Sequence, residues 1–191
     1  IMKKIRNLCN AFLCILVLFY CLTPVLAAEE PPYTVEAKAA MLIDLDTGRS
    51  LLEQNADEKI YPASLTKIMT CLVTLENGNL DDTVTIPQSA FDGLDADSSS
   101  AGLLAGEELP LRELLYCMMV SSANEACNAV AEYLFGSVDA FVAEMNRRAA
   151  ELGCTGTHFA NPHGLHNEDH YTTARDLSRI AQAALKIDTF V

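Results

Sequence analysis

The chain is 191 residues long and carries 26 acidic against 13 basic residues, which gives a formal net charge of −13. An acidic surface of this kind repels a phosphate backbone, so we expect no nucleic-acid partner. Hydrophobic residues make up 50% of the chain, and its length suffices for one domain with a substantial core.

The first 27 residues have the organisation of a secretory signal peptide. Three basic residues within the first six precede an apolar run over residues 8–22, small residues follow at Ala27 and Ala28, and no acid comes before Glu29. The apolar run is short for a bilayer span, so we predict cleavage after Ala27 and export across the cytoplasmic membrane. Residues 28–36 are then a linker, and residues 37–191 belong to the folded domain.

The predicted elements begin with a β-hairpin over residues 39–53, where two apolar-rich runs flank a turn that contains Gly48. Pro62 then opens a helix whose apolar residues keep helical spacing up to Asn77 and Gly78. Residues 79–108 are predicted to be mostly loop. Four more helices are expected over residues 110–120, 123–135, 137–152 and 173–185, with Ser137 and Thr173 as N-terminal caps. A hairpin followed by a helical block indicates an α+β fold.

The cysteines beyond residue 27 are scattered and form no Cys-x-x-Cys pair; they are Cys71, Cys117, Cys127 and Cys154. Their spacing leaves disulfide pairing open. Their residue type favours buried free thiols on apolar helix faces.

Ser64 and Lys67 are the first candidates for chemistry. They lie three residues apart at the start of the Pro62 helix, where such positions share a face, so we expect the hydroxyl and the amine within hydrogen-bond reach. A buried lysine with a lowered pKa can act as the base that activates a serine. The alternative is a capping serine followed by a solvated lysine, and a Ser-x-x-Lys arises by chance about once in a chain of this length.

Ser122-Ala123-Asn124 is the second candidate, and no other Ser-x-Asn occurs in the chain. It follows Lys67 by about 55 residues, at a predicted junction between two helices. A Ser-x-x-Lys together with a Ser-x-Asn at such a junction is far rarer than either pattern alone. For Asn124 the alternative is a helix-start cap.

These motifs resemble those of the serine D-alanyl-D-alanine carboxypeptidases, the low-molecular-weight penicillin-binding proteins, whose signature set is Ser-x-x-Lys, Ser-x-Asn and Lys-Thr-Gly. The likeness covers nearly all of residues 37–185. It runs through the stretches AAMLIDLDTGRSLLEQNADEKIYPASLTKIMT, SSSAGLLAGEELPLRELLYCMMVSSANEACNAVAEYL, FVAEMNRRAAELGCTGTHFANPHGL and HYTTARDLSRIA.

The resemblance implies a β-lactamase/D,D-peptidase-like fold, with a helical block against an antiparallel sheet that is only partly present here. It implies that Ser64 is the nucleophile that forms an acyl-enzyme and that Lys67 is its general base. Ser122 would relay a proton to the leaving D-alanine, and Asn124 would orient Lys67 and bind the substrate amide. The implied substrate is the peptidoglycan pentapeptide ending in D-Ala-D-Ala, with β-lactam antibiotics as covalent inhibitors and no cofactor.

The third motif of the family is missing, because no lysine in the chain is followed by Thr-Gly or Ser-Gly. In the family this motif comes after the region where the chain stops. We therefore expect the chain to be the N-terminal part of a longer protein, and we expect these residues alone to be inactive. A membrane anchor of the kind that family members carry would also lie in the missing C-terminal region.

Two other functions compete with the carboxypeptidase. A class A β-lactamase would need a water-activating glutamate and usually has Asp at the middle of Ser-x-Asn, where this chain has Ala123. A non-catalytic penicillin-binding module would keep the fold while its catalytic residues decayed. All four motif residues are intact, which favours the enzyme.

The four histidines suggest a metal site at first sight; they are His158, His163, His166 and His170. Spacings of three and four suit zinc only when a helix presents the histidines on one face. Pro162 and Gly164 break any helix here, so we predict a loop and no metal. The resemblance implies that His163 lies near the rim of the active site.

Overall fold

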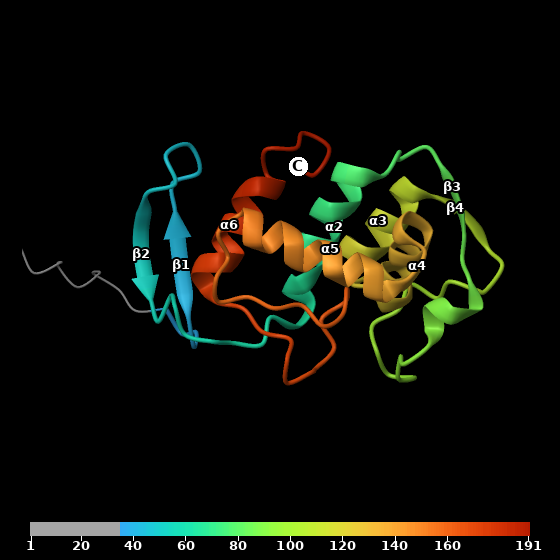
Figure 1. Ribbon diagram of the computed structural model, residues 1–191, viewed down its shortest axis with the longest axis horizontal. Helices are drawn as coiled ribbons and strands as arrows, with labels where there is room; N and C mark the ends of the chain where they lie inside the picture. Colours follow the sequence, from blue (N-terminus) through green and yellow to red (C-terminus); the bar gives the residue numbers. More distant parts are fainter. Residues whose placement is uncertain (1–34) are drawn as a thin grey trace, which may run out of the picture. The chain divides into compact units, whose positions relative to one another are not determined.

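The computed structural model describes residues 35–191, so the predicted signal peptide over residues 1–27 lies outside the described residues, as does most of the predicted linker. Two short antiparallel sheets and a block of helices make up the described part (Figure 1). The strands are β1 (Ala40–Ile43), β2 (Ser50–Gln54), β3 (Thr83–Thr85) and β4 (Glu108–Pro110). The helices are α2 (Thr66–Asn77), α3 (Leu111–Val120), α4 (Asn124–Phe135), α5 (Val138–Glu151) and α6 (Ala174–Ala184), with short 3-10 turns at η1 (Ala63–Leu65) and η2 (Gln88–Phe91). This arrangement confirms the predicted α+β class.

The strands β1 and β2 form the predicted hairpin, with Leu42 opposite Leu52 across the antiparallel pair. In the connecting turn Gly48 has a φ of +69°. The Asp44 carboxylate accepts hydrogen bonds from the backbone N–H and the hydroxyl of Thr47, which fixes the turn locally. Strand β1 packs against α6, and Figure 1 shows the hairpin beside that helix.

Helix α2 occupies the centre of the helical block and contacts α3, α4, α5 and α6. It begins soon after Pro62 and ends before Gly78, as predicted, and eight of its 12 residues are buried. A helix buried on most sides must satisfy its polar side chains with protein partners, because water does not reach them. Thr66, Lys67 and Thr70 accordingly make buried hydrogen bonds to residues outside α2.

The remaining helices begin and end with the expected capping residues. The Ser137 hydroxyl accepts a hydrogen bond from the Ala140 backbone N–H at the start of α5, and Thr173 accepts one from Asp176 at the start of α6. Gly136 ends α4 in the left-handed conformation. No helix within residues 35–191 combines the length and the apolar composition needed to cross a bilayer.

Residues 79–108 contain more regular structure than the sequence predicted. Strands β3 and β4 pair there, with Val84 opposite Leu109, and Val84 and Ile86 belong to the core. Strands of three residues are too short to display the two-residue alternation that identifies a strand in a sequence. All four cysteines of the described part are free, as predicted. Cys71 and Cys127 are buried on helices, whereas Cys117 is only half-buried and Cys154 lies after the end of α5.

Candidate active site

Ser64 lies in η1, the tight turn directly before α2. Its hydroxyl oxygen accepts a hydrogen bond from the Ser122 hydroxyl at 3.0 Å. Ala63 and Ser122 both adopt a left-handed backbone, with φ of +48° and +55°, and Asn55 is the one other non-glycine residue of residues 35–191 that does so. Strained backbone of this kind persists only where the surrounding structure enforces it, and it is typical of functional sites.

Lys67 lies in the first turn of α2 and is only 2% exposed. Its Nζ donates hydrogen bonds to Asn124 Oδ1 and to the backbone carbonyl oxygen of His163, each at 2.8 Å. Asn124 is the first residue of α4 and makes no capping bond with its side chain. Neither alternative from the sequence describes the site: the lysine is not solvated, and Asn124 is not a helix cap.

The four motif residues are therefore brought together as two bonded pairs, Ser64 with Ser122 and Lys67 with Asn124. The sequence predicts the Ser64 hydroxyl and the Lys67 amine within hydrogen-bond reach; among the described residues the two groups make their hydrogen bonds to other partners. The reason is that Ser64 lies in the 3-10 turn outside α2, while the two acceptors from α4 and from the loop after α5 engage the amine.

Burial lowers the pKa of Lys67 below its ordinary value, because the charged ammonium loses its hydration. The nearby Cys127 and Glu125 oppose this shift and do not cancel it. A neutral amine has two N–H donors and one lone pair. Since Asn124 and His163 provide acceptors for two N–H groups, the lone pair of the neutral amine remains free to accept a proton.

The loop that follows α5 supplies the second acceptor for Lys67, and we call residues 157–173 the histidine loop. The Thr70 hydroxyl of α2 donates to the carbonyl oxygen of Pro162 at 2.5 Å, beside the bond from Lys67 to His163. Gly164 has a φ of +96°, and a Cβ placed on it would lie 1.9 Å from the carbonyl oxygen of Ala63. The histidine loop thus touches the turn that carries Ser64.

These loop contacts were not foreseen from the sequence, which singled out His163 only as a rim residue. The acceptor for Lys67 is the His163 backbone carbonyl, and a backbone atom leaves no signal in residue type. The buried partners of Thr66 and Thr70 lie 104 and 92 residues away along the chain. The visible signal in the sequence is the glycine of Pro162-His163-Gly164, which predicts a break in a helix and does not by itself indicate a contact with Ala63.

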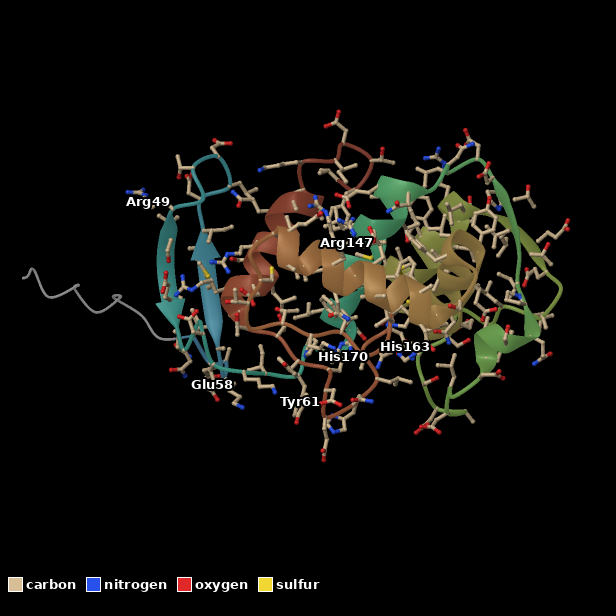
Figure 2. The ribbon with its side chains drawn as sticks, viewed as in Figure 1. Arg49, Glu58, Tyr61, Arg147, His163 and His170 are labelled. Atoms are coloured by element: carbon tan, nitrogen blue, oxygen red, sulfur yellow. The ribbon has the colours of Figure 1, made fainter. Side chains whose placement is uncertain are left out.

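A cavity of about 370 Å³ opens next to the two bonded pairs. Ser64, Asn124 and His163 line it, and its other lining residues are Tyr61, Ala63, Asp97, Ser98, Ser99, Gly164, Leu165 and His166. The wall formed by residues 97–99 is tied to α4, because the backbone N–H of Asn124 donates to the carbonyl oxygen of Ser99 at 2.9 Å. Figure 2 shows Tyr61, His163 and His170 gathered near the start of α2.

The four histidines do not converge on a common point. His163 and His170 are buried, whereas His158 and His166 are exposed. Within residues 35–191 no group of three or more His, Cys, Asp or Glu side chains is placed to hold a metal ion. Of the four motif residues, Ser64 and Asn124 line the cavity, and each is hydrogen-bonded to a motif residue outside that lining, Ser122 and Lys67 respectively.

Comparison with known proteins agrees with this geometry. The family model described as D-alanyl-D-alanine carboxypeptidase, Peptidase_S11, matches residues 25–190. The D-alanyl-D-alanine carboxypeptidase DacF of Bacillus subtilis is 40% identical over 160 residues, which cover 81% of this chain and 40% of that protein. The chain therefore spans well under half the length of this relative.

Solved structures resemble the chain over most of its length. The D-alanyl-D-alanine carboxypeptidase of Mycobacterium tuberculosis superposes with a TM-score of 0.79 at 32% identity, over 86% of this chain and 61% of that one. Penicillin binding protein 5 of Haemophilus influenzae gives a TM-score of 0.76 at 35% identity, over 82% and 47%. The fold is that of the D,D-peptidases, as predicted. The chain belongs to the D-alanyl-D-alanine carboxypeptidase family, Peptidase_S11.

The close approach of Gly164 to Ala63 yields a test of the site's packing. We expect Gly164→Ala to lower the free energy of unfolding by about 3 kcal/mol, roughly 1 from the positive φ and 2 from displacing the Ser64 turn. Gly102→Ala is the matched control, because Gly102 also has a positive φ but open space around its Cα. It should cost only about 1 kcal/mol. Equal losses in urea unfolding of both variants would contradict this account.

Two buried histidines make stability depend on pH. Burial lowers the pKa of His163 and of His170 from 6.5 to about 4, with Lys67 adding to the shift of His163 and His158 to that of His170. Between pH 6.5 and 4 the unfolded chain binds protons that the folded chain excludes, so stability is full above 6.5 and falls with pH. We expect a loss of roughly 2 kcal/mol per histidine at pH 5.

Urea unfolding between pH 7 and pH 5 measures this dependence. His170→Gln should make the slope shallower, because it removes one of the two titrating groups. His166→Gln is the control, since His166 is exposed and its removal should leave the slope unchanged. A free energy of unfolding that stays constant from pH 7 to pH 5 in the parent protein would refute the interpretation.

Proposed function

We propose that the protein is a serine D-alanyl-D-alanine carboxypeptidase that removes the terminal D-alanine from peptidoglycan stem peptides through an acyl-serine intermediate. One observation carries this proposal: Ser64 and Asn124 line the same cavity, and they are hydrogen-bonded to Ser122 and to the buried Lys67 respectively. Membership of the family supports the same reaction.

The hydrogen-bond pattern supports a defined path for the proton of Ser64. Because the Ser64 oxygen accepts from Ser122, its own proton is not used in that bond. Neutral Lys67 has a free lone pair, and a desolvated amine with a lowered pKa is a suitable acceptor for that proton. The Ser64 oxygen then attacks the carbonyl carbon of the penultimate D-alanine.

The leaving group and the deacylation step complete the proposed cycle. When the C–N bond breaks, Ser122 passes its proton to the nitrogen of the departing D-alanine and regains one from the Lys67 ammonium, which returns the amine to its neutral form. The N-terminal end of α2 favours negative charge on the acyl oxygen. Water then hydrolyses the ester and restores Ser64. Asn124 both orients Lys67 and lines the cavity, so it is placed to bind a substrate amide.

The same serine chemistry makes β-lactam antibiotics the expected covalent inhibitors, because they acylate an activated serine. We place the protein outside the cytoplasmic membrane, at the cell wall. The basic start, apolar run and small residues of the first 27 positions support export. No nucleic acid, metal or cofactor takes part in the proposed reaction.

Replacement of the nucleophile tests the reaction class. In the full-length protein Ser64→Ala should abolish covalent labelling by a fluorescent penicillin, because no other residue is proposed to form the ester. Ser121→Ala is the matched control, since Ser121 adjoins the motif but is exposed, and it should label normally. Intact protein mass spectrometry should show one penicillin added to the parent protein and none to Ser64→Ala.

The lifetime of the adduct separates the carboxypeptidase from a β-lactamase. A class A β-lactamase hydrolyses its penicilloyl ester rapidly, whereas the adduct on this protein should persist. Fast turnover of nitrocefin would replace the proposal with a β-lactamase. Labelling of Ser64 with no release of D-alanine from a pentapeptide would leave a penicillin-binding module without peptidase activity.

Replacement of the base tests the role of the buried amine. Lys67→Met keeps the apolar stem but removes the lone pair, so the rate constant of acylation by benzylpenicillin should fall by about two to four powers of ten. Lys38→Met serves as the control, because Lys38 is an exposed residue in a surface ion pair with Glu58. A nearly normal rate in Lys67→Met would assign the proton transfer to another group.

A further inference from the structure

We propose that His170 is a positioning residue for the reaction: its neutral ring braces the histidine loop against the first turn of α2, and so holds the carbonyl of His163 in place for Lys67. The inference rests on the proposed function, because it concerns the base of that same site. His170 itself does not reach the cavity, so it acts through Thr66 and the loop.

His170 spans three segments with its two ring nitrogens. Nε2 lies 2.7 Å from the Thr66 hydroxyl oxygen, and Nδ1 accepts a hydrogen bond from the backbone N–H of Ala160 at 3.1 Å. The ring is 2% exposed and meets the edge of Phe159 at a centroid distance of 5.6 Å. The imidazole thus links the two ends of the histidine loop, at Ala160 and at His170 itself, to α2. We call its hydrogen bonds to Thr66 and Ala160 the brace.

These contacts determine which nitrogen carries the proton. Because the Ala160 N–H donates to Nδ1, that nitrogen must be unprotonated, and the proton of the neutral ring is on Nε2. Nε2 therefore donates to Thr66. A doubly protonated ring would set an N–H of Nδ1 against the N–H of Ala160, so the brace requires the neutral form.

The bond from His170 to Thr66 lies next to Lys67, both in the chain and in space. Thr66 immediately precedes Lys67, and its Oγ1 would lie 3.0 Å from a Cβ placed on Gly164. Between the two ends that His170 joins, the loop presents the Pro162 and His163 carbonyls to α2. Loosening the loop therefore moves the acceptor that directs the amine.

A second set of hydrogen bonds lies within the histidine loop, near its tip. These bonds do not attach the loop to α2. Asn161 Oδ1 accepts from the backbone N–H of Gly164 at 2.7 Å, and Asn161 Nδ2 donates to the carbonyl oxygen of Leu165 at 2.9 Å. These bonds keep residues 161–165 in one shape. The bonds of His170 and Thr70 then hold this segment in position against α2, so that the His163 carbonyl oxygen can accept from Lys67.

Variants of His170 in the full-length protein separate positioning from bulk packing. His170→Ala removes both hydrogen bonds, and we expect the acylation rate constant for benzylpenicillin to fall by about ten- to a hundredfold, the effect of a misplaced catalytic group. The dissociation constant of the complex before acylation should change less than about threefold. In His170→Gln the amide oxygen can accept from Ala160 and the amide nitrogen can donate to Thr66, so the rate should recover most of the loss.

Two further variants complete the design. His158→Gln is the matched control, because His158 belongs to the same loop but is exposed, and it should acylate normally. Thr66→Val removes the acceptor of the Nε2 proton with little change of volume, so its effect should not add to that of His170→Ala. Equal rates in His170→Ala and the parent, or no recovery in His170→Gln, would overturn the proposal.

The failure of this proposal is distinguishable from failure of the proposed function. Penicillin labelling of the parent at Ser64 tests the function alone and does not involve His170. If His170→Ala does not fold, the acylation rate of Thr66→Val tests the proposal in its place, and a normal rate there would overturn it. Nitrogen NMR of the histidine rings in the parent protein tests the two hydrogen bonds themselves. A His170 ring protonated on Nε2 alone supports the brace, and a ring protonated on Nδ1 contradicts it.

Discussion

The burial of the Lys67 amine is the constraint on which the rest of the site depends. A lysine that is 2% exposed must have partners for its N–H groups, because an unsatisfied buried donor is costly. The structure supplies them from residues 57 and 96 positions away. Three segments, the start of α2, the start of α4 and the histidine loop, must therefore meet at one amine, and the cavity forms where they meet.

The backbone at this meeting point leaves little freedom. Ala63 and Ser122 are held in the left-handed region on the two sides of the serine pair, and Gly164 is the residue that allows the loop to approach the Ala63 carbonyl. Left-handed conformations of non-glycine residues cost of order 1 kcal/mol or more and persist when packing enforces them. The strain is thus evidence that the two hydroxyls are positioned by the fold and not by their own preferences.

The sequence predicted those parts of the structure that depend on near neighbours. The caps at Ser137 and Thr173, the hairpin turn at Gly48 and the course of α2 all follow from contacts within a few residues. The motif spacing also identified residues that do lie together. The bond between His170 and Thr66 could not be predicted, because its partners are 104 residues apart, and neither could a backbone carbonyl as the acceptor for Lys67.

This difference between local and long-range contacts has a chemical consequence for Lys67. In an isolated helix the Lys67 amine would be hydrated and would keep an ordinary pKa, because local spacing alone neither buries it nor gives it acceptors. The lowered pKa arises only when the histidine loop and α4 close over the amine. Under the proposed mechanism, the reactivity of Ser64 therefore depends on the packing of a loop almost a hundred residues further along the chain. For the same reason the Ser-x-x-Lys pattern alone is weak evidence for catalysis, whereas the pattern with its buried, long-range partners is strong evidence.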